Sequence, residues 1–383
     1  MVVMALDHIR DFMTWRTLAP EVLESHNSFA LFFTRFMTHY CAPTFFFLAG
    51  TGVFLMLGRR SKSEVSRFLW TRGLWLLFVE CTIVRLAWTF VPRPASSMSV
   101  IFSLGLCMII LSALIHVPVR WLTPLSLAVI AGHNLLDGIV SSALPQPWNR
   151  VWQVLHEPGY FRPSDRYFHI LYPIIPLFAV MALGYCFGTI IKSPRDLRIR
   201  YTAWIGTAAT FLFVLLRSIN GYGNGMTQGM IATGHWRVMS TSMMTLASFF
   251  NVTKYPPSLD YLLVTLGPAL LALAAFDRWN LGRGWVASKF VVFGRVPMFY
   301  YICHLYVVHL VALDFATLYH QPAKQLGWNG GGFVLGVAQP GFGFNLPMIY
   351  LGWVFSIAIL YFPCAWYARY KTEHKQNVWL SYL

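Results

Sequence analysis

Apolar residues along the chain come in long blocks, which are separated by short basic stretches or by stretches rich in Pro and Gly. Each block approaches the roughly 20 residues that an α-helix needs to cross a hydrocarbon core about 30 Å thick. The blocks predict ten membrane spans, near residues 1–13, 31–57, 68–91, 98–117, 121–143, 168–191, 201–219, 258–276, 289–316 and 347–368. The pattern therefore predicts an all-α, polytopic integral membrane protein with about 10 transmembrane helices, in which residues 1–383 form a single domain.

The first block is too short to cross a membrane unaided, because the polar stretch TWRTLAPEVLESHNS begins after about a dozen residues. We expect this sequence to begin inside its first helix, so that the helix is N-terminally truncated. An anomalous first helix is the alternative.

Basic residues indicate the orientation of the spans, because Lys and Arg collect in cytoplasmic loops. Short basic connections follow the second, sixth and eighth spans, as GRRSKSEVSR, KSPRDLRIR and DRWNLGRGWVASK, and the tail contains RYKTEHK. The opposite connections are longer and rich in Pro, Gly, Trp and Asn. We expect the basic connections on the cytoplasmic side, and because the span count is even, both termini are expected there too.

The composition agrees with a membrane protein, since the chain is 57% hydrophobic and 11% charged, against about 25% charged residues in typical soluble domains. Lys and Arg outnumber Asp and Glu by 29 to 14. In a membrane protein this excess orients the loops, so the lipid bilayer is the expected partner and nucleic acid is not. The six cysteines lie in apolar blocks without a CxxC spacing, which favours neither a disulfide framework nor a zinc site.

Ionisable residues inside the spans are candidates for function, because each one costs at least about 2.5 to 3.5 kcal/mol near the bilayer centre. They occur in five clusters, together with one asparagine: Asp7, His8, Arg10 and Asp11; His39; Glu80 and Arg85; His133, Asn134 and Asp137; His304, His309 and Asp314. With a cytoplasmic N-terminus, four of these clusters place imidazoles and carboxylates toward the outer side of the membrane. This common depth predicts a shared polar site.

Helical spacing indicates which of these side chains can meet. Asp7 and Arg10 are three residues apart on one helix, which predicts an internal ion pair. His133 and Asp137 are four residues apart, a spacing at which a carboxylate can hold an imidazole in one tautomer. Glu80 and Arg85 face each other poorly on an α-helix, and we interpret them as structural.

The chemistry of this site is narrowed by motifs that the sequence lacks. His304 and His309 are five residues apart without an accompanying acid, unlike the HExxH pattern of zinc enzymes, so no metal is expected. Walker A, GxGxxG and GxSxG motifs are also absent from the sequence. What remains is proton relay in a transporter, or acid–base and nucleophilic catalysis of group transfer.

An ordered set of motifs resembles a known family. The segments MALDHIRDF, FFTRFMTHYCAPTFFFLAGTG, RFLWTRGLWLLFVE, GHNLLDG, KYPPSLDYLLVTLGPALL, FGRVPMFYYICHLYVVHL and WLSYL are similar to those of bacterial DUF1624-type membrane proteins. These are homologues of heparan-α-glucosaminide N-acetyltransferase among the transmembrane acyltransferases. The resemblance covers nearly the whole chain, although members usually begin earlier, with a SLDxLRG-like stretch before the first helix.

The resemblance implies a multi-pass acyltransferase of the bacterial inner membrane. Such an enzyme takes an acetyl group from acetyl-CoA on the cytosolic side and delivers it to a sugar amine or hydroxyl on the periplasmic side. The acceptor is then a carbohydrate or glycoconjugate. The basic residues Arg59, Arg60, Arg67 and Arg72 are predicted to hold the phosphates of CoA, because Arg pairs strongly with phosphate oxygens, while a positive-inside anchor near anionic lipid is the simpler interpretation.

The catalytic residues are predicted from the same comparison. The essential histidine of the lysosomal enzymes lies in a HAxWxG-like stretch, which His26 in HNSFAL does not match. We therefore expect Asp7 to orient or charge His8, with His39 opposite, and one imidazole to act as general base or transient acyl carrier. The sequence does not separate these two routes. The other residues expected at the same depth in the membrane are predicted to bind substrate: His133, Asn134, Asp137, His304 and His309.

A transporter or flippase is the competing hypothesis, in which the same His and Asp residues relay protons. Gly- or Pro-interrupted helices in matching halves would favour it, but YPIIP and VTLGPALL do not form a matched pair. The oligomeric state stays open, with a homodimer as one alternative.

Overall fold

The computed structural model describes residues 1–14, 28–90, 97–161, 168–225, 233–322, 326 and 342–382. The chain divides into two compact units. The small unit consists of residues 1–20, 81–94 and 280–383, and the large unit consists of residues 21–80 and 95–279. The single domain expected over residues 1–383 stays a prediction.

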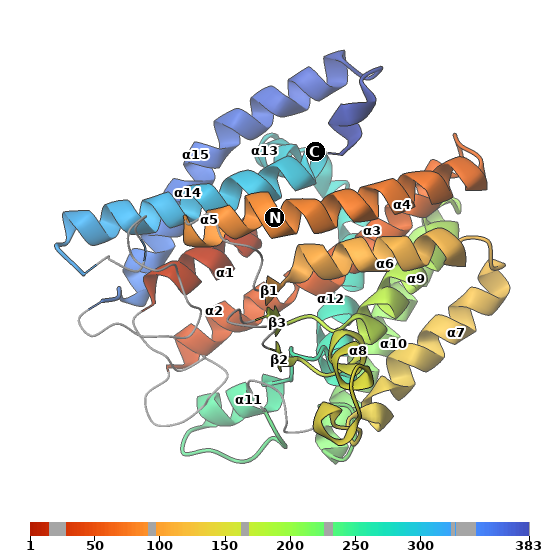
Figure 1. Cartoon of the computed structure of the whole chain (residues 1–383), viewed down its shortest axis with the longest axis horizontal. Helices are drawn as coiled ribbons and strands as arrows, with labels where there is room; N and C mark the ends of the chain where they lie inside the picture. Colours follow the sequence, from red (N-terminus) through yellow and green to blue (C-terminus); the bar gives the residue numbers. More distant parts are fainter. Residues whose placement is uncertain are drawn as a thin grey trace. The chain divides into compact units, whose positions relative to one another are not determined.

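The large unit is a set of packed helix pairs. Its α-helices are α2 (Phe29–His39), α3 (Cys41–Met56), α4 (Lys62–Val79), α6 (Val100–Leu114), α7 (Val119–Gly132), α8 (Trp148–Leu155), α9 (Ile174–Ile191), α10 (Arg195–Ile219), α11 (Ser242–Phe250) and α12 (Leu259–Trp279). Helix α4 runs along α6, α3 packs on α9, and α10 packs on α12 (Figure 1). The packing therefore joins helices that lie far apart in the sequence.

Glycines let the paired helices approach closely. A Cβ atom at Gly50 of α3 would lie 1.9 Å from the carbonyl oxygen of Met181 on α9, and one at Gly184 would lie 2.0 Å from the Phe47 oxygen. The same arrangement recurs twice, at Gly73 with Gly105 between α4 and α6, and at Gly206 with Gly267 between α10 and α12. Small residues at such crossings are typical of helices packed inside membranes.

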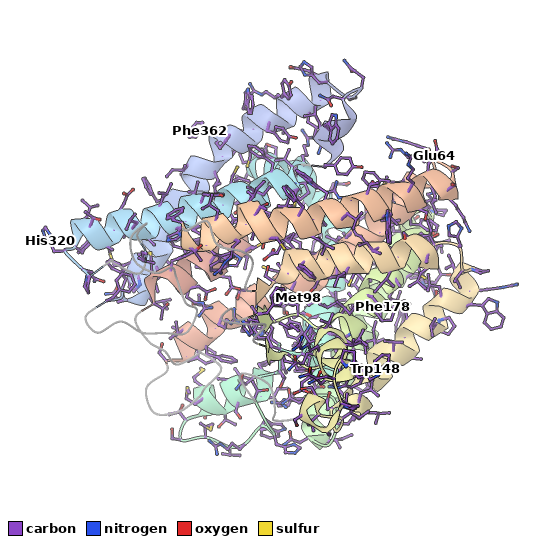
Figure 2. All side chains as sticks on the ribbon, viewed as in Figure 1. Glu64, Met98, Trp148, Phe178, His320 and Phe362 are labelled. Carbon is purple, nitrogen blue, oxygen red and sulfur yellow. The ribbon has the colours of Figure 1, made fainter. Side chains whose placement is uncertain are left out.

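Short elements lie in and beside the predicted outer connections, and the span predicted over 168–191 is wrong at its start, because β3 occupies Phe168–Ile170 and α9 begins at Ile174. Strands β1 (Ser97–Met98), β2 (Gly159–Phe161) and β3 (Phe168–Ile170) form a sheet in the order β1-β3-β2, parallel between β1 and β3 and antiparallel between β2 and β3. In Figure 2, Met98 marks this sheet and Trp148 marks the first residue of α8. The sheet has two or three residues in each strand, so the architecture is all-α in class.

The small unit contains α1 (Val2–Met13), α5 (Arg85–Thr89), α13 (Trp285–Arg295), α14 (Pro297–Leu318) and α15 (Leu346–Glu373). Helix α1 packs against both α14 and α15. The Trp353 Nε1–H of α15 donates to the Val2 oxygen over 2.9 Å, and the Phe344 N–H, just before α15, donates to the Met13 oxygen over 2.8 Å. These two bonds tie α15 and the residues before it to the two ends of α1. The span predicted over 289–316 is wrong at its start, because Pro297 begins a new helix after α13.

The described residues contain six helices that are long and apolar enough to cross a membrane. They are Phe29–Met56, Ile174–Ile191, Arg195–Ile219, Leu259–Trp279, Pro297–Leu318 and Leu346–Glu373. Apolar side chains on their surfaces are exposed, as Phe362 of α15 is with 73% of its surface (Figure 2). The multi-pass, all-α membrane class is confirmed, whereas the count of about ten spans is not: α1, α6 and α7 have 12, 15 and 14 residues.

Candidate functional site

The charges near the start of the chain lie on the well-formed helix α1. The Arg10 guanidinium donates to Asp7 Oδ1 over 3.1 Å and to Asp11 Oδ1 over 2.5 Å. The ion pair predicted between Asp7 and Arg10 is therefore confirmed, and Asp11 shares the same cation. A buried arginine between two carboxylates lowers the cost of placing these charges in an apolar helix.

His8 lies on α1 beside these charges and is partly accessible, with 15% of its side chain exposed. Its Nδ1 atom is 3.9 Å from Asp11 Oδ2, while Asp7 takes Arg10. Consecutive residues of a helix point about 100° apart, so the adjacent Asp7 faces away from His8 and pairs with Arg10. Asp11, three residues after His8, lies on the same face as the His8 ring. The Trp88 ring meets the His8 ring edge-on, with the ring centres 5.0 Å apart.

His304 of α14 lies against His8, with the two ring centres 5.1 Å apart. The His304 side chain is fully buried, and its Nδ1 lies 2.5 Å from the Tyr301 oxygen and 3.2 Å from the Tyr300 oxygen. Because carbonyl oxygens only accept, the hydrogen-bond network assigns the proton to Nδ1. Nε2 of the neutral ring then carries a lone pair, and it has no hydrogen-bond partner among the described residues.

His309, one turn and a half further along α14, is also fully buried, but each of its ring nitrogens faces a backbone oxygen. Its Nδ1 lies 2.7 Å from the Ala87 oxygen and its Nε2 lies 2.9 Å from the Leu326 oxygen. The ring is stacked between Phe12 and Phe90, at centre distances of 4.3 and 4.0 Å. His309 therefore links three segments of the small unit, and both ring nitrogens are occupied.

In the large unit, His133 and Asn134 tie the end of α7 to the start of α12. The His133 ring nitrogens lie 2.9 Å from the Ile130 oxygen and 2.8 Å from the Pro257 oxygen. Asn134 Oδ1 accepts the Leu259 N–H over 2.9 Å. These atoms hold the backbone together, and a role in substrate binding stays a prediction.

The expected contact between His133 and Asp137 is wrong. Helix α7 ends at Gly132, and a 3₁₀-helix over His133–Leu136 follows, in which residues three apart come together. Asp137 accordingly accepts from Asn134 over 2.9 Å and pairs with His156 Nε2 over 2.9 Å. His156 was not predicted, because it follows α8 in a connection between predicted spans, and candidate residues were sought inside the spans.

His39 is buried at the end of α2, with its ring centre 5.4 Å from that of Tyr261 on α12. The Tyr261 hydroxyl donates to the His39 backbone oxygen over 2.9 Å. The catalytic role of His39 stays a prediction, as does its place opposite His8.

The predicted CoA-binding arginines lie around the turn between α3 and α4. Arg59, Arg60 and Arg67 are exposed, and the guanidinium groups of Arg60 and Arg72 lie 5.6 and 5.7 Å from the Phe68 ring centre. Their turn is fixed by a capping box, in which the Ser61 hydroxyl and N–H both donate to Glu64 at the start of α4 (Figure 2). These bonds hold the pKa of Glu64 below its usual value.

Two further residues bear on these predictions. Lys192 at the end of α9 reaches the same turn, with its Nζ 5.0 Å from the Phe54 ring centre, and it was not predicted. His26 lies outside the described residues. Among the residues that the structure describes, no group of three or more His, Cys, Asp or Glu side chains is arranged to hold a metal ion.

Comparison with known proteins places the chain in a family. The model of the family described as heparan-alpha-glucosaminide N-acetyltransferase, catalytic, matches residues 1–218, which is more than half of the 383 residues. The chain belongs to this family. No curated protein and no solved structure matched the chain.

The family membership makes the protein a membrane acetyltransferase in class. The matched residues of this heparan-alpha-glucosaminide N-acetyltransferase family member include His8, His39 and His133, while His304 and His309 lie beyond the match. The match gives no support to the transporter or flippase alternative.

Proposed function

We propose that this family member transfers an acetyl group from acetyl-CoA to a sugar amine or hydroxyl, with His8 and His304 as the reacting imidazole pair. The observation that carries the proposal is the buried Nε2 lone pair of His304 beside the His8 ring, for which the described part of the chain supplies no hydrogen-bond partner. A buried polar atom without a hydrogen-bond partner lowers the stability of the fold by about 1–3 kcal/mol, which indicates that the atom has a function. Accepting a proton during catalysis is such a function for His304 Nε2.

His8 is the imidazole that substrate reaches, because its side chain is partly exposed whereas His304 is fully buried. In a direct transfer, the acceptor nitrogen or oxygen attacks the thioester carbonyl and His8 takes the proton that the acceptor loses. The carbon–sulfur bond breaks, and the CoA thiolate receives that proton. The Nε2 lone pair of His304 supports the charged imidazolium of His8 during this step, and Asp11 Oδ2 at 3.9 Å from His8 Nδ1 adds a negative charge.

An acyl-histidine route uses the same pair. A lone pair of His8 attacks the thioester, a carbon–nitrogen bond forms, and the CoA thiolate leaves. The proton on the other nitrogen of His8 then passes to His304 Nε2, which leaves a neutral acyl-imidazole. The acceptor next displaces His8, the proton returns from His304, and the proton of the acceptor ends on the thiolate.

The basic turn between α3 and α4 supports a cytosolic donor site. Arg59 and Arg60, with Arg67 and Arg72 along α4, present guanidinium groups that suit the phosphates of CoA. The acceptor is a carbohydrate or glycoconjugate, in keeping with the name of the family, and we place it on the other side of a bacterial inner membrane.

The test uses the full chain in detergent, acetyl-CoA as donor and glucosamine as acceptor probe, with free CoA thiol as the readout. His8→Ala and His304→Ala are each expected to lower the rate per folded protein by about 10²- to 10⁴-fold, the usual worth of an acid–base group. His116→Ala is the control, because His116 is exposed. Radiolabelled acetyl-CoA without acceptor labels the protein in the acyl-histidine route and not in direct transfer.

Two results would remove the proposal. One is the absence of acetyl-CoA binding to the wild-type chain by calorimetry. The other is full turnover in both His8→Ala and His304→Ala.

A further inference from the structure

A groove of about 620 Å³ lies on the large unit, where the start of α10 meets the end of α12. Its lining includes Asp196, Arg200, Ala203, Trp204, Thr207 and Arg278. Two contacts between α10 and α12 fix the helices that form the groove. On one side Gly206 and Gly267 bring the helices together, and on the other the Arg198 guanidinium grips the Asp277 carboxylate over 2.7 and 3.1 Å.

The charged side chains inside this groove are Arg200, Arg278 and Asp196. Arg195 and Arg198 neutralise Asp277, whereas Arg200, Arg278 and Asp196 have no ion-pair partner among the described residues. The groove thus offers two cations and one anion. A ligand that matches it carries a phosphate for the two guanidinium groups and an ammonium for the carboxylate.

The groove continues along an exposed face of α10, on which the apolar side chains of Trp204 and Phe211 follow the charged end. Arg200, Trp204, Thr207 and Phe211 follow at intervals of four, three and four residues, so they share one face of the helix. Trp204 is 66% exposed and Phe211 is 67% exposed. At about 1.5 Å per residue, Phe211 lies about 16 Å beyond Arg200, close to half of a hydrocarbon core about 30 Å thick.

We propose that this groove binds one phospholipid with a phosphoethanolamine headgroup. The phosphate lies between Arg200 and Arg278, the ammonium faces Asp196, and an acyl chain follows α10 past Ala203 and Trp204 toward Phe211. The apolar side chains along this face favour a lipid over a soluble phosphate compound, which would leave that surface unused. Trp204 beside the headgroup fits the usual depth of tryptophan at a membrane interface, and basic pockets at helix ends are known to hold lipid headgroups.

The test measures lipid binding to the delipidated full chain in detergent, by native mass spectrometry and by the shift in apparent melting temperature. We expect phosphatidylethanolamine to bind at least fivefold more tightly than phosphatidylcholine, whose trimethylammonium cannot donate a hydrogen bond to Asp196. Arg200→Gln with Arg278→Gln should weaken both lipids at least fivefold. Asp196→Asn should remove the preference between them and leave phosphatidylcholine binding within twofold of wild type.

Arg120→Gln with Trp121→Ala is the matched control, because this exposed pair at the start of α7 also combines an arginine with a tryptophan. It should leave lipid binding unchanged. Should the double arginine variant fail to fold, Thr207→Trp fills the groove and should block labelling of residues 196–207 by a photoreactive phosphatidylethanolamine.

The proposal is overturned if the two lipids bind wild type equally, if phosphatidylglycerol binds more tightly than phosphatidylethanolamine, or if the control loses binding as much as the groove variant. It is also overturned if CoA binding, and not lipid binding, is what the groove variant loses.

Discussion

At the scale of single residues, two fully buried histidines on α14 differ in what their nitrogens meet. His309 has a backbone oxygen at each nitrogen, from Ala87 and Leu326, whereas His304 has backbone oxygens at Nδ1 only. A histidine whose two ring nitrogens both face backbone oxygens stabilises the fold through its single N–H, and its other nitrogen is covered by a carbonyl oxygen. The hydrogen bonds therefore separate His309, which we interpret as structural, from His304, for which we propose a reactive role, although both lie in the same sequence motif.

This difference predicts opposite effects of two substitutions. His309→Ala removes the N–H that donates to one of two buried carbonyl oxygens, Ala87 or Leu326, and opens a gap between Phe12 and Phe90, so we expect a loss of about 2–5 kcal/mol in stability. The apparent melting temperature of the detergent-solubilised protein measures this loss. Turnover per folded molecule should stay near wild type, whereas His304→Ala should lower turnover more than stability. Equal losses of turnover per folded molecule in the two variants would contradict the assignment.

At the scale of elements, regular helices were predictable and their ends were not. The spacing of Asp7 and Arg10 predicted their ion pair correctly because α1 is helical throughout Val2–Met13. The spacing of His133 and Asp137 misled, because the α-helix ends at Gly132 and the geometry changes there. No apolar pattern signals such a change, since the tertiary bonds of His133 to Pro257 and of Asn134 to Leu259 determine it.

Some features of the candidate site were likewise predictable from the sequence and others were not. The residue types at His8 and His304 were found from the sequence, because charge and imidazole stand out in apolar blocks. Their contact was not, because nothing in the sequence says that α1 packs against α14. Trp88 carries no charge, so a sequence pattern does not distinguish it from a core aromatic residue.

The pairing of helices through glycines gives a prediction at this scale. Gly50→Ala places a Cβ 1.9 Å from the Met181 oxygen on α9, so α3 and α9 must move apart, and overpacking of this kind typically costs about 1–3 kcal/mol or more. Gly52→Ala, two residues along α3, meets nothing within 4 Å. We expect a lower yield of folded protein and a lower melting temperature for the first variant only. Similar melting temperatures for the two variants would show that the close approach of α3 to α9 is not required.

At the scale of the whole molecule, the number of crossings follows from which connections share a side. If the basic turn after α3 and the basic turn after α9 are both cytoplasmic, then α9 begins outside. An odd number of helices must therefore cross between the turn after α3 and the start of α9. Three candidates lie in that interval: α4 with the π-helical turn Glu80–Val84 that follows it, α6, and α7. Helices α6 and α7 are short for a span, but both pack against the apolar α9. The proposed ten-span arrangement uses all three.

Cysteine labelling tests this arrangement in cells that express a chain whose native cysteines are replaced by alanine. Four exposed serines mark the connections, namely Ser63, Ser142, Ser240 and Ser288. We expect Ser142→Cys and Ser240→Cys to react with a membrane-impermeant maleimide in intact cells, and Ser63→Cys and Ser288→Cys to react only after lysis, because the basic connections stay cytoplasmic. Labelling of Ser63→Cys and Ser142→Cys from the same side would mean an even number of crossings between them. In that case α4, α6 and α7 do not all span the bilayer. Separately, labelling of Ser63→Cys in intact cells would contradict the cytosolic placement of the donor arginines.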